Sequence, residues 1–557
     1  EHIFPPQVAL RQLPQILIPA VATIATTYDY ELWRRGPRLT PLHAVAPQLE
    51  VVSLLWQGLG ERMAGRLEAA VESYERVELL LARADRSGVD PSHALYARLG
   101  IAWGVGMLQA MMGQDQCLAP AELLSRDPWY RVSGVLVRML HGYWQADPAQ
   151  GDAEKERGLL SLIESKSRYW FEGVHLVAEL AAHALADDLE RVKGVLPDLR
   201  SLAELASGWQ PIYDCALGEY HRLRGDLPGA LRCFEQARRG RPGTEHQIWA
   251  LAASGELRVL NLQERFTAAI SAGEEYLKLA VQGGLMHLAQ YVRIPLARAY
   301  AGGGELPRAT SLIDEVLVDF ERRRVTGLTL GWAHEARSQI ALTAGDAALA
   351  QQSLEACSRQ FRAAENALGR RRCEQLAQAL EELSREQQSE QRARDLEHFQ
   401  ATVSTCPTQR ERATAALTLL LEQTGATAGI LKLVGALGGD TVELGLGAER
   451  ERAEQVLEDL LRGISKGDVA AGERAADDAA AADVATVTAL VELPQARPGP
   501  FLPVILRHGG ERPGVSGVVL LLAPAKGMLG EPSALAAALS RALSSGSEQR
   551  ASSWPAA

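Results

Sequence analysis

The chain has 557 residues, of which 47% are hydrophobic and 5% aromatic, and its formal net charge is -11. This length exceeds one compact core, so we expect two or more structural units. The acidic balance argues against a general nucleic-acid binder, because phosphate backbones require a basic surface. None of the six cysteines forms a Cys-x-x-Cys pair, which predicts neither a zinc site nor a disulfide framework and favours a reduced, cytoplasmic setting.

Residues 1–50 are predicted to form a helical N-terminal segment. The chain begins at Glu1 without an initiator methionine or a signal peptide, so we expect it to continue from an upstream region. The apolar run from Ile16 to Ala25 contains Pro19 and is shorter than the roughly 20 residues that span a bilayer. A buried helix is therefore expected there, and no membrane association.

A repeated pattern of small and apolar residues covers residues 51–384 and is clearest over 211–362. In its best copy, Gly218 lets two antiparallel helices approach, Gly225 ends the first helix, and Ala230 lies where the second helix crosses the first. The crossing alanines are Ala230, Ala269, Ala309 and Ala350, which are 39, 40 and 41 residues apart. This spacing predicts a stack of helical hairpins; the alternative is a non-repetitive helical bundle.

Weaker copies of the pattern precede the clear ones. They place crossing residues at Ala70 and Val192, which are 122 residues apart, or about three periods. Two further degenerate hairpins are therefore expected between them, around 102–121 and 129–167.

These residues resemble the tetratricopeptide repeat, in a form whose period is near 40 rather than the usual 34. The resemblance implies an α-α superhelical solenoid that binds proteins or peptides. Such long repeats are typical of bacterial multidomain Ser/Thr kinases and signalling ATPases, where the array serves as a sensor or scaffold after the kinase or nucleotide-switch module. This chain has no Gly-x-x-x-x-Gly-Lys-Ser/Thr loop and no His-Arg-Asp or Asp-Phe-Gly element, so such a module would lie upstream.

The first helix of each hairpin is expected to line the concave face of such a solenoid. Counting outward from the small-residue anchors gives the candidate partner-binding residues Arg222, Arg258, Asn261, Arg298 and Gln339. Arginine donors in this pattern suit a carboxylate-bearing peptide. The alternative is that these arginines are exposed and only solvate a groove.

Residues 385–407 are predicted to form a polar helical linker. The linker belongs to the polar stretch 370–400, in which apolar residues become sparse. Two interpretations remain open: a capping helix for the hairpin stack, or a short coiled coil that makes the chain a homodimer.

After Pro407 the apolar period changes from 3.6 to 2, which predicts an α+β domain over 408–545 and a flexible tail over 546–557. Its helices are expected to frame an antiparallel sheet. The expected helices are 408–424, 448–464 and 533–543, a linker covers 467–482, and the expected strands are 428–434, 441–446, 485–493, 501–507 and 514–523.

The end of this region resembles a GAF domain, through Leu502-Pro503-Val504, Gly509-Gly510 and Gly517-Val518-Val519-Leu520. The resemblance implies binding of a cyclic nucleotide, a tetrapyrrole or a small metabolite, or dimerisation. No cysteine follows Cys406, no Asn-Lys-x-x-x-Phe-Asp-Glu motif occurs, and His508 would be the only histidine available to haem. A structural or dimerising role is therefore expected, and no cofactor.

No motif predicts a catalytic or metal-binding residue. The expected function is a non-catalytic protein-interaction and sensor or scaffold region of a bacterial signalling protein that regulates an upstream kinase or NTPase. The first alternative is a small-molecule receptor that uses the GAF-like domain. A divergent catalytic domain over 408–545 is the second.

Overall fold

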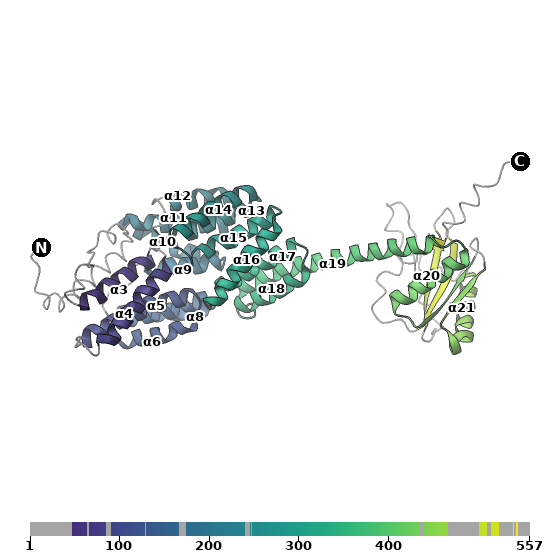
Figure 1. Cartoon of the computed structure of the whole chain (residues 1–557), viewed down its shortest axis with the longest axis horizontal. Helices are drawn as coiled ribbons and strands as arrows, with labels where there is room; N and C mark the ends of the chain where they lie inside the picture. The colour runs from purple at the N-terminus through teal and green to yellow at the C-terminus, as the bar shows by residue number, and fades with distance from the viewer. Residues whose placement is uncertain are drawn as a thin grey trace, which may run out of the picture. The chain divides into compact units, whose positions relative to one another are not determined.

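The computed structural model describes residues 47–63, 66–84, 91–128, 130–165, 174–239, 246, 248–434, 439–465, 501–508 and 514–522, with Leu539, Ala542 and Leu543. Most of the predicted N-terminal segment, the linker 467–482 and the strand 485–493 lie outside these residues. The described residues are mainly helical and contain one small antiparallel sheet. The chain divides into two compact units, Glu1–Ser384 and Arg385–Ala557 (Figure 1). None of the described helices is both long and apolar enough to cross a bilayer.

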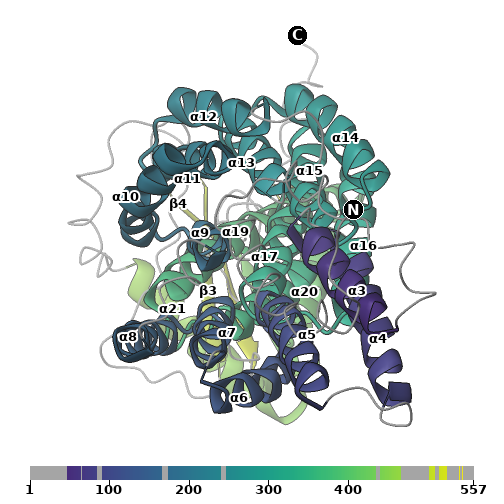
Figure 2. The same cartoon turned by 90° about the vertical axis from the view of Figure 1, so that its left-hand side faces the viewer.

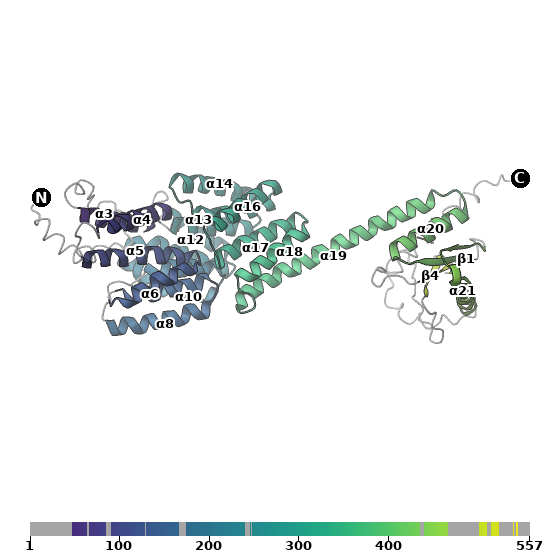
Figure 3. The ribbon, with the colours of Figure 1, turned by 60° about the horizontal axis from the view of Figure 1, so that its bottom comes forward.

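Unit one is built from successive pairs of helices that pack against each other, as α3/α4 and α17/α18 do in Figure 3. Its helices are α3 (Pro47–Met63), α4 (Leu67–Ala84), α5 (Pro91–Met111), η1 (Asp115–Cys117), α6 (Leu118–Arg126), α7 (Arg131–Trp144), α8 (Pro148–Ser165), α9 (Val174–Leu185), α10 (Leu189–Leu205), η3 (Ser207–Trp209), α11 (Gln210–Leu223), α12 (Leu227–Arg239), α13 (Ile248–Leu262), α14 (Phe266–Gln282), α15 (Ala289–Gly302), α16 (Leu306–Arg322), α17 (Leu328–Thr343) and α18 (Ala347–Gln360). The pairs α5/α6 and α7/α8 occupy the places where two degenerate hairpins were predicted.

The pairs from α7/α8 to α17/α18 are joined by the same tight turn. One residue in each turn has a positive φ of 56° to 84°, namely Ala146, Asp187, Gly225, Glu264, Gly304 and Gly345. The next N–H donates back to the preceding helix, as Asp226 does to the His221 carbonyl at 2.9 Å, which is the Schellman pattern. These turns recur 38 to 41 residues apart, and half of them use a residue other than glycine.

The second helix of each pair buries the side chains that the repeat pattern predicted to face the first helix. The crossing alanines Ala230, Ala269, Ala309 and Ala350 are fully buried, which confirms the predicted inner face. The Phe234 ring fills the space left by two glycines, because a Cβ atom on Gly218 or Gly255 would lie 2.7 Å or 2.4 Å from it. Glycine at 218 therefore permits the predicted close approach.

The array curls round until its later helices touch its early ones (Figure 2). In the loop after α16, Thr326 donates its N–H to the Met112 carbonyl at 2.9 Å. The Arg323 carbonyl accepts a 2.5 Å hydrogen bond from Gln114, and the Arg323 guanidinium pairs with Glu68 of α4 at 2.5 Å. We call this set of contacts, between residues more than 200 positions apart, the closing seam.

The seam continues to the turn between α7 and α8. Asn366 donates to the Ala146 carbonyl at 3.1 Å, and Arg362 pairs with Asp147 at 2.9 Å. Gly327 lies so close to this turn that a Cβ atom there would be 2.1 Å from the Trp144 carbonyl oxygen. The seam thus joins the ends of the array by hydrogen bonds and close backbone packing.

Helix α9 lies inside the curled array (Figure 2) and contacts α7, α10, α11 and α17. Every residue from Leu176 to Leu185 is buried. A helix that is enclosed on all sides must satisfy the polar groups at its end with protein donors.

Helix α19 (Ala367–Ser404) confirms the predicted polar helix, as one continuous element. Leu376 and Leu380 belong to the core of unit one, whereas Phe399 and Val403 belong to a core of unit two. Every side chain over 385–395 is exposed, and Ala393 is the only apolar residue there. This stretch lacks the row of apolar side chains that a coiled coil buries between its helices. Dimerisation through it therefore stays a prediction, and the surface of the helix does not favour it.

Unit two confirms a small antiparallel sheet framed by helices. Its elements after α19 are α20 (Gln409–Thr424), β1 (Ala428–Leu433), β2 (Thr441–Leu444), η5 (Gly447–Glu449), α21 (Arg450–Ser465), β3 (Phe501–His508) and β4 (Gly514–Leu522). The strand order is β2-β1-β4-β3, and neighbours are antiparallel, with Ile430 opposite Glu443 of β2 and Leu520 of β4. Of the predicted helix at 533–543, Leu539, Ala542 and Leu543 are described, and all three are helical and buried.

The two faces of the sheet bury alternate residues, as the period of 2 predicted. On β1, Leu431 and Leu433 pack into the core that contains α20. Ala428 and Ile430 pack with α21 on the other face. Both faces of β1 therefore pack against helices through apolar side chains.

Replacing Gly327 with alanine tests the closing seam. Gly225→Ala serves as the control for a positive φ alone, because its φ is 82° and a Cβ atom there meets nothing within 4 Å. Gly327, with φ 70° and ψ -141°, has a conformation nearly restricted to glycine, so alanine there adds further backbone strain to the clash with Trp144. We expect Gly225→Ala to cost about 1 kcal/mol of unfolding free energy from backbone strain alone, and Gly327→Ala to cost at least about 2 kcal/mol more. Chemical denaturation measures both, and equal losses would show that the seam does not form.

Acid should destabilise unit one through His287, which is buried beside the seam. Burial, reinforced by the charge of Arg323, lowers the pKa of His287 to about 4. The unfolded chain, with a histidine pKa near 6.5, binds more protons than the folded chain between these values, so stability is complete above pH 6.5 and falls as the pH drops toward 4. The loss should reach about 3 kcal/mol at pH 4. Denaturation curves of His287→Gln should show a shallower pH dependence, and an unchanged slope would contradict this assignment.

Candidate functional site

The C-terminal end of α9 is the meeting point of charged side chains from four other helices, α11, α13, α17 and α19. Arg222 of α11 donates to the Ala184 carbonyl at 3.2 Å and to Asp187 at 2.7 Å. Arg258 of α13 donates to the same two groups, at 3.2 Å and 2.9 Å. The two guanidinium groups thus neutralise the negative end of the helix and the carboxylate that follows it.

Arg372 of α19 completes this arrangement from the other side. It donates to the Leu185 carbonyl at 2.5 Å and forms a bidentate pair with Glu335 of α17. Its guanidinium also lies 4.4 Å from the centre of the Phe361 ring. Residues 187 positions apart in the chain are joined by the hydrogen bond to Leu185.

Glu219 of α11 supplies the remaining negative charge. It is fully buried, and it accepts from Arg222 at 2.7 Å and from Arg258 at 3.2 Å. We call Asp187, Glu219, Arg222, Arg258, Glu335 and Arg372 the α9 end network. Three carboxylates and two helix carbonyls offset three arginines, so the enclosed charges are compensated.

The local backbone positions Asp187 within this network. Its φ is +56°, at the turn position where Gly225, Gly304 and Gly345 stand in later pairs. Burial would raise the pKa of Asp187, but the charges of Arg222, Arg372 and Arg258 hold this pKa well below its ordinary value. The side chain nevertheless keeps 36% of its surface accessible, so the interior of the array is open to solvent at this point.

Arg298 of α15 differs from the other arginines of the interior. Burial lowers the pKa of its guanidinium, as it does for Arg258, because the charged form loses hydration. The difference lies in its partners. Arg298 has no hydrogen bond or ion pair with the residues that the structure describes, and its side chain is only partly buried. It is therefore a cation whose donors remain available.

The neutral members of the predicted set also keep unused polar atoms. Asn261 donates to the Pro295 carbonyl at 2.8 Å, whereas its Oδ1 is buried without a partner. The Oε1 atom of Gln339 is likewise buried and unpaired within the described part of the chain. Unpaired buried acceptors also occur elsewhere in unit one, at Gln109 and Gln290, so what distinguishes Asn261 and Gln339 is their place in the repeat, at or about one turn from the position of Arg298.

The structure corrects the expectation that all five candidate residues present free groups in a groove. Arg222 and Arg258 are buried and pair with the chain's own α9, because the array curls far enough to enclose that helix. The alternative, in which the arginines are exposed and only solvate a groove, is wrong for these two residues as well. Asn261, Arg298 and Gln339 retain unused hydrogen-bonding capacity.

A second buried charge cluster lies one and two turns earlier on α9. Glu179 is 1% exposed, contacts Lys155 of α8 at 2.5 Å, and lies 3.4 Å from His183. Burial alone would raise the pKa of Glu179, but the hydrogen bond from His183 and the charge of Lys155 hold this pKa at about 2. The cluster fixes α9 against α8 through Glu179 Oε1, whereas Glu179 Oε2 is buried without a hydrogen-bond donor in the described part of the chain.

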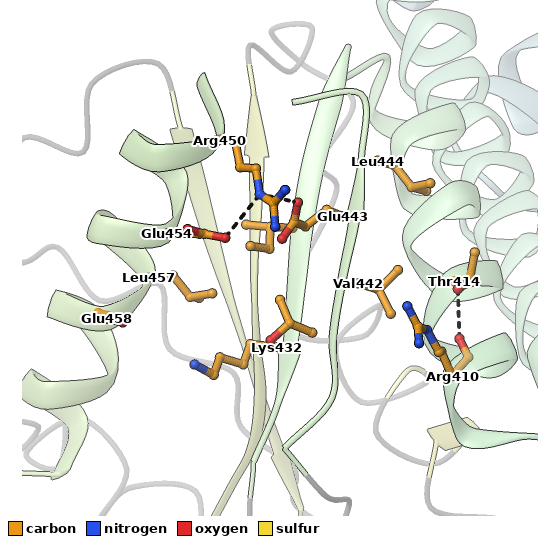
Figure 4. A pocket seen from close by; sticks show the side chains of 12 residues that line it. Arg410, Thr414, Lys432, Val442, Glu443, Leu444, Arg450, Glu454, Leu457 and Glu458 are labelled. Atoms are coloured by element: carbon orange, nitrogen blue, oxygen red, sulfur yellow. Dashed lines mark hydrogen bonds and ion pairs between the residues drawn. The ribbon is translucent and has the colours of Figure 1, made fainter. Parts of the chain in front are cut away.

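Unit two contains a pocket of about 730 Å³ bordered by α20, β1, β2 and α21 (Figure 4). Eight of its twelve lining residues are polar or charged: Arg410, Thr414, Lys432, Thr441, Glu443, Arg450, Glu454 and Glu458. Arg450 is engaged by Glu443 at 3.0 Å and Glu454 at 3.3 Å. Neither Lys432 nor Arg410 has a side-chain ion pair with any described residue, so the pocket offers two uncommitted cations.

Among the residues with described positions, no three or more His, Cys, Asp or Glu side chains are arranged to hold a metal ion. Comparison of the chain with protein-family models and with curated proteins gives no match.

Neutralising Glu219 tests the α9 end network. Glu219→Gln removes one of the two carboxylates that the buried Arg222 and Arg258 guanidinium groups share, which should cost about 3 kcal/mol of unfolding free energy. The control Glu235→Gln removes a carboxylate from a surface pair with Arg239 and should cost no more than about 1 kcal/mol. Denaturant titrations provide both values, and a loss for Glu219→Gln as small as the control's would refute a compensated buried network.

Proposed function

We propose that this chain is a non-catalytic binding and scaffold region, in which a tetratricopeptide-type solenoid captures a peptide of a partner protein and a GAF-like domain follows. The observation that carries this proposal is the unused polar capacity inside the array, at Asn261, Arg298 and Gln339. These residues come from α13, α15 and α17, which are the first helices of successive pairs. Arg298 and Gln339 occupy the same repeat position, and Asn261 lies about one turn beyond it.

The repeated turn supports the solenoid part of the proposal. The positive-φ residue and the Schellman hydrogen bond recur at the spacing of the sequence repeat. An aspartate then caps the next helix in several copies, with Asp188, Asp226 and Asp346 each accepting a backbone N–H. A hairpin defined in this way is a modular unit suited to stacking.

The charge of the interior defines the expected ligand. Arg298 offers a planar set of donors to a carboxylate. The Asn261 and Gln339 oxygens are buried, so they would accept from peptide N–H groups only after their side chains turn toward the ligand. A peptide with an acidic side chain or a free C-terminal carboxylate meets the requirement set by Arg298. The α9 end network would then form a fixed wall of the site.

The long repeat also motivates the wider role. We propose that the region regulates a kinase or NTPase module encoded upstream. Reading the coding sequence before Glu1 tests this part: a start codon nearby without such a module would contradict it.

Peptide selection tests the binding site. Purified protein is exposed to synthetic peptides of varied sequence, each with a free and with an amidated C-terminus, and affinities are measured by fluorescence anisotropy. Arg298→Ala should lower the affinity for the selected peptides by 10-fold or more, because the contact between the peptide carboxylate and the arginine is lost. Arg298→Lys should recover part of that affinity. Arg265→Ala, on the exposed N-terminus of α14, should leave affinity unchanged. Equal binding to Arg298→Ala and wild type would place the site elsewhere.

The pocket of unit two favours one alternative, a small-molecule receptor. Its size falls within the range of ligand sites, although its polar lining suits a polar anion better than an apolar compound. Thermal denaturation with nucleotides and tetrapyrroles should show a rise in Tm that Lys432→Ala removes, since a ligand stabilises the state to which it binds. No shift with any of these compounds would count against the alternative.

A further inference from the structure

Two cysteines face each other between the last helix pair and α19. Cys357 lies on α18 and is fully buried, and Cys373 lies on α19 and is 7% exposed. Their Sγ atoms are 3.9 Å apart. A disulfide requires about 2.05 Å, so the two sulfur atoms must approach by less than 2 Å.

The surroundings make the two thiols unequal. The hydrogen bond between them lowers the pKa of Cys373 and raises that of Cys357. The Arg372 guanidinium also favours a thiolate at Cys373, whereas burial and the Glu335 carboxylate oppose it. Cys373 is the more accessible of the two residues, so it is the one that a small oxidant reaches first.

We propose that Cys357 and Cys373 are a redox modification site that forms a reversible disulfide when the protein meets a peroxide. The Cys373 thiolate attacks hydrogen peroxide and becomes a sulfenic acid, and the cleaved O–O bond yields hydroxide, which takes up a proton to give water. The Cys357 thiol then attacks the sulfenic sulfur, which forms the S–S bond and releases a second water. The two thiols lose two electrons in total, and the peroxide gains them.

The disulfide would join α19 to α18 beside the residues that hold α19 in unit one. Arg372, one residue before Cys373, holds the end of α9 through the Leu185 carbonyl and pairs with Glu335. Leu376 and Leu380, on the following turns of α19, belong to the core of unit one. Cross-linking therefore anchors the start of the helix that continues into unit two, and it removes loop-closure entropy from the unfolded chain.

Thiol mapping of the whole protein tests the proposal. The protein is treated with hydrogen peroxide, the reaction is quenched, and the protein is unfolded in denaturant so that the buried free thiols are also alkylated before mass spectrometry without reduction. We expect a cross-linked peptide that contains Cys357 and Cys373, alkylation of the other four cysteines, and a higher Tm that dithiothreitol reverses.

Alanine variants separate this modification from simple packing. Cys357→Ala is tolerable because Ala237 occupies the equivalent position of α12, and both Cys357→Ala and Cys373→Ala should lose the peroxide-dependent rise in Tm. Cys406→Ala should keep it. Continued alkylation of Cys357 and Cys373 after peroxide, oxidation confined to Cys233 or Cys406, or a rise in Tm that persists in Cys357→Ala would overturn the proposal.

Discussion

The carbonyl groups at the end of a buried helix set the main constraint on this protein. Enclosing α9 removes water from Ala184 and Leu185, and a buried carbonyl without a donor costs free energy. Arg222, Arg258 and Arg372 supply the donors, and each arginine in turn needs a carboxylate. The network that results draws helices from distant parts of the chain onto one point.

That constraint changes how a repeat array should behave. An open stack of hairpins contacts only its neighbours, so its parts can unfold separately. Here the α9 end network and the closing seam connect residues more than 180 positions apart. We infer that the interior is a rigid frame. Within it, Arg298, Asn261 and Gln339 are the side chains that keep unused hydrogen-bonding groups.

Local sequence patterns predicted much of the fold, because helix starts, crossing alanines and alternating strand faces depend on neighbours in the chain. The non-glycine turns at Ala146, Asp187 and Glu264 escaped a search for glycine. The candidate site was predicted only in part. Arg258 and Arg298 share a position in the repeat, and they differ only because Arg258 contacts partner groups on other helices, which the repeat pattern does not reveal. The sequence offered one signal for the α9 end network, namely Asp187 at a turn position where later copies have glycine. It offered none for Glu335 and Arg372, because their pairing depends on how far the array curls.

Native-state hydrogen exchange at increasing denaturant tests cooperative closure most directly. If the network and seam join the array, the slowest amides from α7 to α18 should share one opening free energy and one dependence on denaturant, equal to those of global unfolding. A graded series, in which α7/α8 or α17/α18 opens at lower free energy than α11/α12, would show that the hairpins act as an open stack and would contradict a closed frame.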